Sequence, residues 1–199
     1  AIRMRPTHKN LMLPGIGVGG YCLTKDPLLA SWSKQNLIGA DNGLYMSEMA
    51  VSTNDNMPVY AFNCLKKIFK NESIKKKNIY FLGVSYAPDV GDTRYSPVEL
   101  FCQLLKKEEC TMYFNDPFVK FWEEMDVDIK NNFNDLSKSL DIIVISTGHS
   151  LYKNNKDLLS KIIDKDKLVV FDTIGILSDD EIRLLSKKHI VKVLGRGDI

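Results

Sequence analysis

From residue 78 onward, short apolar segments alternate with helical segments, and this alternation is the feature that most limits the possible fold. The apolar segments are residues 78–83, 111–115, 141–146, 168–172 and 190–194, and the helical segments are residues 96–107, 151–163 and 179–188. Short apolar strands separated by helices are typical of a parallel sheet that is covered on both faces. The sequence therefore predicts an α/β domain with a doubly wound, Rossmann-like parallel sheet.

The segment before this domain is predicted to be all-helical, because its apolar residues recur at helical spacing. Leu28, Leu29 and Trp32 are expected to face a core, and the stripe that contains Met46 and Met49 is interpreted as core or as a helix-to-helix interface. The polar residues 71–77 read as a linker. The predicted helices are residues 43–53 and 58–69, with a break at 54–58, and the predicted domains are residues 1–73 and 74–199.

The composition and the ends of the chain exclude several classes of function. The 199 residues carry a formal net charge of +2, and the lysines are interspersed with acidic residues, so no nucleic-acid partner is expected. No apolar stretch approaches the roughly 18 residues that cross a bilayer, and no signal peptide is visible, so we expect a cytoplasmic protein without a membrane partner. The four cysteines show no C-x-x-C pairing, which argues against a metal site. The chain begins without methionine and is expected to be part of something longer.

The candidate ligand loop follows the first predicted strand, since doubly wound sheets bind ligands at the carboxyl ends of their strands. This loop covers residues 84–95, and residues 96–99 are predicted to open the next helix as a capping box. Arg94 could bind a phosphate here, with Asp92 or Glu99 as its alternative partner. His149 follows a later strand and is interpreted first as a loop residue at the same edge.

Neither glycine-containing loop is predicted to bind a dinucleotide unaided. The loop after Gly83 is too poor in glycine for the G-x-G-x-x-G turn. The glycine-rich run of residues 15–20 resembles that motif superficially, but helices follow it where the motif requires a strand, turn, helix and strand.

One cysteine stands in a setting that suits a nucleophile. Cys22 follows the glycine-rich residues 15–20 and precedes a helix that is predicted to start at Asp26 and Pro27. Lys25 and the positive end of that helix would both favour the thiolate. The alternative is that Cys22 is a small residue in a tight turn, Lys25 a surface charge and Asp26 only a helix cap. An unrelated cysteine acyl-transfer enzyme would need a histidine base, for which His8 is the nearby candidate.

Four stretches together resemble the UDP-glucose/GDP-mannose dehydrogenase family, the nucleotide-sugar 6-dehydrogenases. They are Gly17-Val18-Gly19-Gly20-Tyr21-Cys22 with Lys25-Asp26, Asn54-Asp55-Asn56-Met57-Pro58, the segment from Gly83 to Pro97, and Asn115-Asp116-Pro117. They stand in the order and spacing of the family over nearly the whole chain. The resemblance implies the last part of a central helical dimerisation domain, followed by a UDP-binding domain, without the family's N-terminal NAD-binding domain.

The resemblance also implies a reaction and roles for individual residues. Such enzymes oxidise the C6 alcohol of a UDP-sugar twice, pass two hydrides to NAD, and form a cysteine thioester on the way to the uronic acid. By this match Cys22 is the nucleophile, Asp26 assists hydrolysis, and Lys25 and Arg94 approach the cofactor. The residues implied to contact the substrate are Arg5, Gly15, Gly17, Val18, Gly19, Gly20 and Tyr86.

One departure from the family pattern concerns substrate recognition. The family commonly has a lysine that touches the substrate where Ala87 stands here. The glycine-rich form of residues 14–20 is closer to enzymes of UDP-N-acetylhexosamines, whereas Lys25-Asp26 is closer to the UDP-glucose type, so both sugars stay open. The main prediction is an NAD-dependent UDP-sugar 6-dehydrogenase portion that forms a homodimer and is inactive alone. The alternative is a non-catalytic module for sugar-nucleotide binding and dimerisation.

Overall fold

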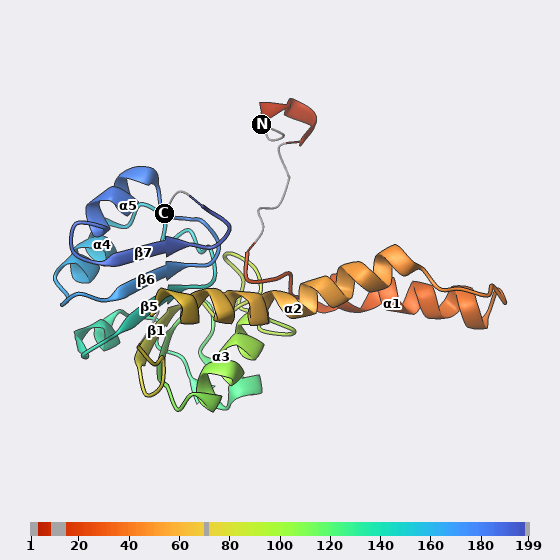
Figure 1. Ribbon diagram of the computed structural model, residues 1–199, viewed down its shortest axis with the longest axis horizontal. Helices are drawn as coiled ribbons and strands as arrows, with labels where there is room; N and C mark the ends of the chain where they lie inside the picture. The colour runs from red at the N-terminus through yellow and green to blue at the C-terminus, as the bar shows by residue number, and fades with distance from the viewer. Residues whose placement is uncertain (1–3, 9–14, 70–71, 198–199) are drawn as a thin grey trace.

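Figure 1 shows the computed structural model, which describes residues 4–8, 15–69 and 72–197. The helices are η2 (Pro6–His8), α1 (Tyr21–Asn36), α2 (Tyr45–Ile68), α3 (Pro97–Lys107), η3 (Glu123–Met125), η4 (Asn134–Ser137), α4 (Lys156–Ile163) and α5 (Asp179–Leu185). The strands are β1 (Asn78–Leu82), β2 (Thr111–Asn115), β3 (Phe121–Trp122), β4 (Val127–Asp128), β5 (Ile142–Ile145), β6 (Val169–Asp172) and β7 (Ile190–Val193). The predicted strands 78–83, 111–115, 141–146, 168–172 and 190–194 are confirmed within a residue or two at each end.

The main sheet is parallel, as the alternating pattern predicted. Its strand order is β2-β1-β5-β6-β7, and Tyr80 of β1 lies between Tyr113 of β2 and Ile143 of β5. The chain first adds β2 on one side of β1 and then returns to add β5 on the other. The strand order therefore reverses between β1 and β5, which is where sheets of this kind bind their ligands.

Helices cover both faces of this sheet, which confirms the doubly wound fold. Ile79 and Phe81 of β1 point into a core formed with α2 and α3, and Tyr80 and Leu82 point into a second core with α4 and α5. Successive residues of a strand face opposite sides, so both sides of β1 must be apolar. This is why the buried strands are continuous apolar runs with no polar alternation.

Helix α2 runs unbroken through the segment where the sequence predicted a break, so that prediction was wrong. Pro58 lies inside the helix and is buried. Proline removes one helical hydrogen bond, the one its N–H would give to the carbonyl of Asn54. The helix continues because its second half is anchored: Ala61, Phe62 and Leu65 are buried in the same core as β1. Tertiary packing outweighs the local break signal.

Two other helix starts differ from the sequence prediction. α1 begins at Tyr21, with Gly20 at φ 84° before it, so Asp26 and Pro27 lie inside the helix and Asp26 is not its cap. Ser96 precedes α3 but forms no capping box, because its hydroxyl donates to the carbonyl of Val84 at 2.7 Å. A capping box is present instead at the start of α5.

The first half of α2 and the whole of α1 extend away from the sheet as a helical arm, residues 21–53 (Figure 1). Leu28, Leu29 and Trp32 are exposed on it, so the prediction that they face a core was wrong for the described chain. In the part of the chain that the structure describes, no element besides α1 and α2 packs over these side chains. Polar contacts help to join the two helices, with Ser31 bonded to the Glu48 carboxylate and to the Leu44 N–H. Within the described residues, no helix is both long and apolar enough to pass through a bilayer.

Candidate functional site

The glycine-rich loop that precedes Cys22 lies directly against the loop that follows β1. The N–H of Gly20 donates to the carbonyl of Arg94 at 3.2 Å. A Cβ atom on Gly19 would lie 2.6 Å from Cβ of Tyr86 and 2.6 Å from the carbonyl oxygen of Tyr95, and one on Gly20 would lie 2.9 Å from the Tyr86 ring. The sequence suggested that these glycines leave room for a bound molecule. The structure gives a second reason, which is that two loops touch here through their backbones.

The same glycine-rich loop crosses the carboxyl edge of the sheet. A Cβ atom on Gly15 would lie 3.1 Å from the side chain of Ile174, just after β6, and one on Gly17 would lie 2.9 Å from Pro97. Between them, Ile16 is buried. The loop thus spans from the end of β6 to the start of α3, over the position where the strand order reverses.

Asn54 fixes this loop to helix α2. Its side-chain oxygen accepts a hydrogen bond from the Val18 N–H at 2.7 Å, and its side-chain nitrogen donates to the Val18 carbonyl at 2.8 Å. The two bonds satisfy both backbone groups of one loop residue. The asparagine that the sequence assigned to a helix break therefore holds a candidate substrate residue from the middle of a helix.

Cys22 lies in the first turn of α1, exposed, immediately after the glycine-rich loop. The N-terminal end of a helix carries a partial positive charge and unpaired N–H groups, which suits an anion or a developing oxyanion. Asp26 lies four residues later and so shares the same face of the helix. Asp26 lies inside α1, so the alternative that it serves only as the helix cap was wrong.

Lys25, three residues after Cys22 on α1, contacts two neighbouring side chains. Its Nζ lies 4.2 Å from the centre of the Tyr21 ring and 3.5 Å from Oδ1 of Asp26. Desolvation acts to lower the pKa of Lys25, but Tyr21 and Asp26 outweigh it and raise that pKa above its usual value. The lysine therefore places a positive charge near the start of α1.

Arg94 and Tyr86 lie at the rim of the same region. The Arg94 guanidinium binds Asp92 through Nε at 3.0 Å and Nη2 at 2.7 Å, so Asp92 is its partner, and Glu99 pairs with Gln103 instead. The hydrogen bond from Arg94 lowers the pKa of Asp92 despite some desolvation. Although it is paired, the Arg94 side chain stays 67% exposed.

Arg5 is not brought to this region within the described chain. It is exposed, in the short N-terminal segment 4–8, and Figure 1 shows that segment apart from α1. The segment also carries the predicted histidine base of the acyl-transfer alternative. Of the eleven predicted site residues, ten lie on the glycine-rich loop, in the first two turns of α1 or on the loop after β1, and Arg5 lies apart from them.

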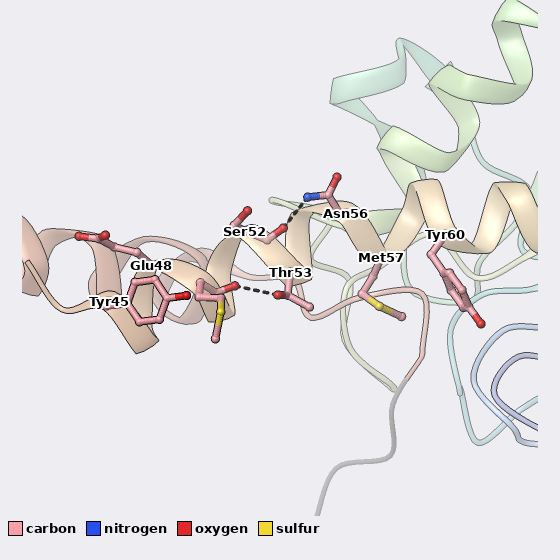
Figure 2. A pocket seen from close by; sticks show the side chains of 8 residues that line it. Tyr45, Glu48, Ser52, Thr53, Asn56, Met57 and Tyr60 are labelled. Atoms are coloured by element: carbon pink, nitrogen blue, oxygen red, sulfur yellow. Dashed lines mark hydrogen bonds between the residues drawn. The ribbon is translucent and has the colours of Figure 1, made fainter.

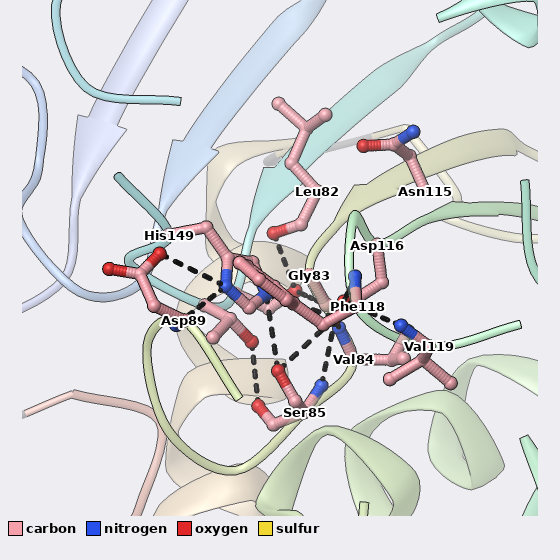
Figure 3. Close-up of polar contacts among 12 residues, drawn as sticks. Leu82, Gly83, Val84, Ser85, Asp89, Asn115, Asp116, Phe118, Val119 and His149 are labelled. Atoms are coloured by element: carbon pink, nitrogen blue, oxygen red, sulfur yellow. Dashed lines mark hydrogen bonds and ion pairs between the residues drawn. The ribbon is translucent and has the colours of Figure 1, made fainter. Parts of the chain in front are cut away.

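A buried polar cluster, formed by Ser85, Asp116 and His149, lies at this edge of the sheet, and the sequence analysis did not predict it (Figure 3). Nε2 of His149 lies 3.0 Å from Oδ2 of Asp116 and 3.1 Å from Oγ of Ser85. His149 lies in a loop after β5, as the sequence predicted, and its side chain is fully buried. The sequence held two signals: each residue follows a strand, and Ser85 and Asp116 lie in two of the four stretches that resemble the family.

A hollow of 630 Å³ lies along α2, on the side seen in Figure 2. Its lining includes Tyr45, Met49, Met57 and Tyr60, at the spacing of one helix face. Met46 and Met49 are exposed, so the methionine stripe is not core of the described chain. Its use as a helix-to-helix interface stays a prediction. The described residues hold no group of histidine, cysteine, aspartate and glutamate side chains suited to a metal ion.

Comparison with known proteins is consistent with this architecture. Residues 80–179 match the model of the UDP-glucose/GDP-mannose dehydrogenase family, UDP binding domain. A UDP-N-acetyl-D-mannosamine dehydrogenase of Methanococcus maripaludis is 32% identical over 99% of this chain and 44% of its own length. The crystal structure of an NDP-N-acetyl-D-galactosaminuronic acid dehydrogenase from Methanosarcina mazei Go1 matches 95% of this chain and 40% of its own, with a TM-score of 0.81 and 27% identity. For a UDP-D-ManNAc dehydrogenase structure from Pyrococcus horikoshii the TM-score is 0.74 at 26% identity, over 100% of this chain and 44% of the other.

The chain therefore belongs to the UDP-glucose/GDP-mannose dehydrogenase family, whose UDP-binding domain forms its α/β part. It spans less than half the length of the curated relatives that match nearly all of it. The relatives are nucleotide-sugar dehydrogenases, which confirms the resemblance drawn from the four sequence motifs.

Proposed function

We propose that this chain forms the substrate side of an NAD-dependent UDP-N-acetylhexosamine 6-dehydrogenase. The observation that carries the proposal is the position of Cys22, exposed in the first turn of α1, where the glycine-rich loop meets the loop after β1 of the UDP-binding domain. The relatives named for N-acetylated UDP-sugars favour that sugar class over glucose. The domain boundary near residue 73 and the cytoplasmic location remain predictions.

In the proposed mechanism the thiolate of Cys22 captures the C6 aldehyde, which forms when the substrate alcohol loses a hydride and a proton. The S–C bond gives a thiohemiacetal, and loss of a second hydride and proton gives a thioester. Water, activated by Asp26, then displaces the sulfur and yields the carboxylate. The helix N-terminus and Lys25 stabilise the negative charge that develops on oxygen at each tetrahedral step.

Each NAD, when bound, would accept one hydride, so two NAD molecules in succession would take up the two hydrides. The cations of this chain that fit a nicotinamide dinucleotide are Lys25 and Arg94. The Arg94 guanidinium is largely exposed at the rim despite its bond to Asp92, and it can still offer a face to a phosphate. Tyr86 and the backbone of residues 15–20 are proposed to line the sugar-nucleotide site.

The decisive experiment replaces Cys22 in the complete enzyme that contains this chain. Cys22→Ser is expected to abolish uronic acid formation with NAD and the UDP-sugar, because an alkoxide equivalent is far less available than a thiolate. The matched control is Cys64→Ser, which changes another cysteine that lies on α2. Normal uronic acid formation by the Cys22 variant would overturn the assignment.

The second candidate, a non-catalytic sugar-nucleotide-binding module, can be separated on the 199-residue chain itself. The enzyme predicts that iodoacetamide alkylates Cys22 in preference to the other cysteines at neutral pH, and that the UDP-sugar protects it. Peptide mapping by mass spectrometry measures both. Slow, unprotected labelling of Cys22 would favour the module.

We also propose that the helical arm forms a homodimer interface. Several large apolar side chains are exposed on the arm, among them Trp32, Met46 and Met49. Single exposed apolar residues are common on protein surfaces, whereas several on one small element are typical of an interaction surface. Met49→Glu is expected to give a monomer by light scattering coupled to size exclusion. Phe121→Glu, which changes an exposed aromatic residue of β3, should leave the dimer intact. A Met49→Glu dimer would contradict this interface.

A further inference from the structure

The buried cluster of Ser85, Asp116 and His149 joins the ends of three neighbouring strands. The three residues follow β1, β2 and β5, which are adjacent in the order β2-β1-β5. The side chains of Asp116 and His149 are fully buried, and Figure 3 shows their polar contacts. A charged group is rarely buried unless it is fully hydrogen-bonded, so the cluster must have a defined bonding pattern.

The hydrogen bonds determine which nitrogen of His149 carries the proton. Nδ1 accepts the N–H of Asp89 at 2.9 Å, so it holds no proton. Nε2 must then carry it and donate toward Asp116 Oδ2, at 3.0 Å, with Ser85 Oγ at 3.1 Å. His149 is therefore a neutral bridge with one accepting and one donating side.

Asp116 holds both of the loops that flank it. Its Oδ2 accepts the N–H groups of Val84 at 2.9 Å and Ser85 at 3.2 Å, and its Oδ1 accepts those of Phe118 at 2.9 Å and Val119 at 3.2 Å. One carboxylate thus fixes the backbone after β1 to the backbone after β2. Such charge-assisted bonds to backbone N–H groups are stronger than neutral ones.

The cluster holds the loop after β1 by hydrogen bonds on both sides of Tyr86. Asp116 holds the loop at Val84 and Ser85, and His149 holds it at Asp89, whose carboxylate in turn accepts two bonds from Ser150. Between these points stands Tyr86, which lies against Gly19 and Gly20. A short segment fixed at both ends has little freedom to move its central side chain.

We propose that Asp116 and His149 are positioning residues that hold Tyr86 where it closes on the glycine-rich loop. They would not touch the substrate. They set the shape of the loop that does, so that little ordering remains to be done when a nucleotide binds. The inference rests on the proposed function, in which Tyr86 and the glycine-rich loop line the UDP-sugar site.

Substitutions at His149 can separate its two hydrogen bonds. Asparagine places an acceptor near the position of Nδ1, and glutamine places a donor near that of Nε2, whereas alanine supplies neither. His149→Ala is expected to raise the dissociation constant for UDP about tenfold, and His149→Asn and His149→Gln to raise it less, since each keeps one bond. Titration calorimetry with UDP measures this on the whole chain. His149→Asn also covers the case in which the alanine variant does not fold.

The matched control is His189, the other buried histidine described, which accepts the Leu168 N–H at 3.4 Å at the opposite, amino-terminal edge of the sheet. His189→Ala is expected to lower stability but to leave the UDP dissociation constant unchanged. Trypsin cleavage after Arg94 gives a readout that needs no ligand, and His149→Ala should accelerate it about tenfold while His189→Ala does not.

The outcomes are distinguishable. Wild-type UDP affinity and cleavage rate in His149→Ala, or equal effects of His149→Ala and His189→Ala, would overturn the positioning role. If the wild-type chain binds no UDP, the proposed function fails. Cleavage then decides alone: faster cleavage only in the His149 variants supports the positioning role, and equal rates overturn it.

Discussion

The helical arm and the α/β part of this chain use apolar residues in opposite ways. In the α/β part, large side chains such as Phe81, Phe101 and Trp122 are completely buried. In the arm, Trp32 is 52% exposed and Met46 is 70% exposed. Both regions are rich in apolar residues, so composition does not distinguish them. The difference lies in whether a second layer within the same chain covers them.

This contrast indicates where each region obtains its stability. The sheet has helices on both faces and closes two cores by itself. The arm is a pair of helices with few buried residues, and two helices alone cannot cover their outer faces. The apolar surface of the arm is therefore suited to a partner, whereas the apolar side chains of the α/β part are already buried in its two cores.

The largest expected effect tests the buried side of this comparison. Phe101→Ala removes a ring that packs edge-on to Phe81 at 6.0 Å between centroids, and should lower the free energy of unfolding by about 3–5 kcal/mol. Trp32→Ala, on the arm, should change it by less than about 0.5 kcal/mol in the dissociated chain. Urea unfolding at low protein concentration measures both. Similar losses for the two variants would mean that the arm has a core of its own.

The next effect tests the contact between the two glycine-bearing loops. Gly19→Ala forces a methyl group against Tyr86 and the carbonyl of Tyr95, and should lower the free energy of unfolding by about 1–3 kcal/mol. The control is Gly197→Ala, because a Cβ atom there would meet nothing within 4 Å among the described residues. Urea midpoints compare the two. A tolerated alanine at residue 19 would show that the loops do not touch in solution.

A smaller effect tests the pair of hydrogen bonds by which Asn54 of α2 holds the glycine-rich loop. Asn54→Ala loses both bonds to Val18 and should lower the free energy of unfolding by about 1–2 kcal/mol. Asn56→Ala, two residues along the same helix, loses only a bond to Ser52 within the helix and should cost less than about 0.5 kcal/mol. Thermal unfolding of the pair gives the difference directly. Equal losses of unfolding free energy in the two variants would show that the bonds from Asn54 to Val18 do not stabilise the fold.

The smallest effect compares two buried aspartates at strand ends. Burial acts to raise the pKa of Asp116, but hydrogen bonds from His149, Val84 and Phe118 lower it below its usual value. For Asp172 burial prevails, and it raises the pKa despite bonds from Leu177 and nearby backbone N–H groups. The two groups therefore contribute to acid stability with opposite signs.

A carboxyl with a depressed pKa stabilises the fold above its unfolded-state pKa of about 3.9, and this stability is lost as pH falls through the folded-state value. A carboxyl with a raised pKa does the reverse and favours the fold as pH falls. Asp116→Asn should thus flatten the loss of stability below about pH 4, whereas Asp172→Asn should remove a gain in stability that the wild type makes as pH falls toward about 4, so its effect lies above about pH 4. Urea midpoints between pH 7 and pH 3 test this, and parallel curves for both variants would refute it.

Much of the fold follows from local pattern, and the exceptions share one cause. The five strands of the main sheet could be located because each is a short apolar run, and burial on both faces of a parallel sheet demands such runs. The predicted break at residues 54–58 and the helix start at Asp26 failed because both rest on local capping and proline signals. In the structure Asn54 binds the glycine-rich loop, and Gly20 lets α1 begin before Asp26.

The proposed catalytic residues could be chosen from the sequence, but the buried residues that support the neighbouring loops could not. Cys22, Lys25 and Asp26 lie close in the sequence, so their proximity needs no tertiary structure. The cluster of Asp116 and His149 joins residues 33 positions apart, and only the sheet order brings them together.

The sequence by itself determined the class of fold, the family and the cysteine that we propose as the nucleophile, because each depends on residue type and short-range spacing. The tertiary structure decided which apolar residues are covered, why the glycines before Cys22 must be glycines, and what holds Tyr86 in place. These depend on contacts between segments far apart in the chain, and such contacts form only when the strands assemble in the order β2-β1-β5-β6-β7.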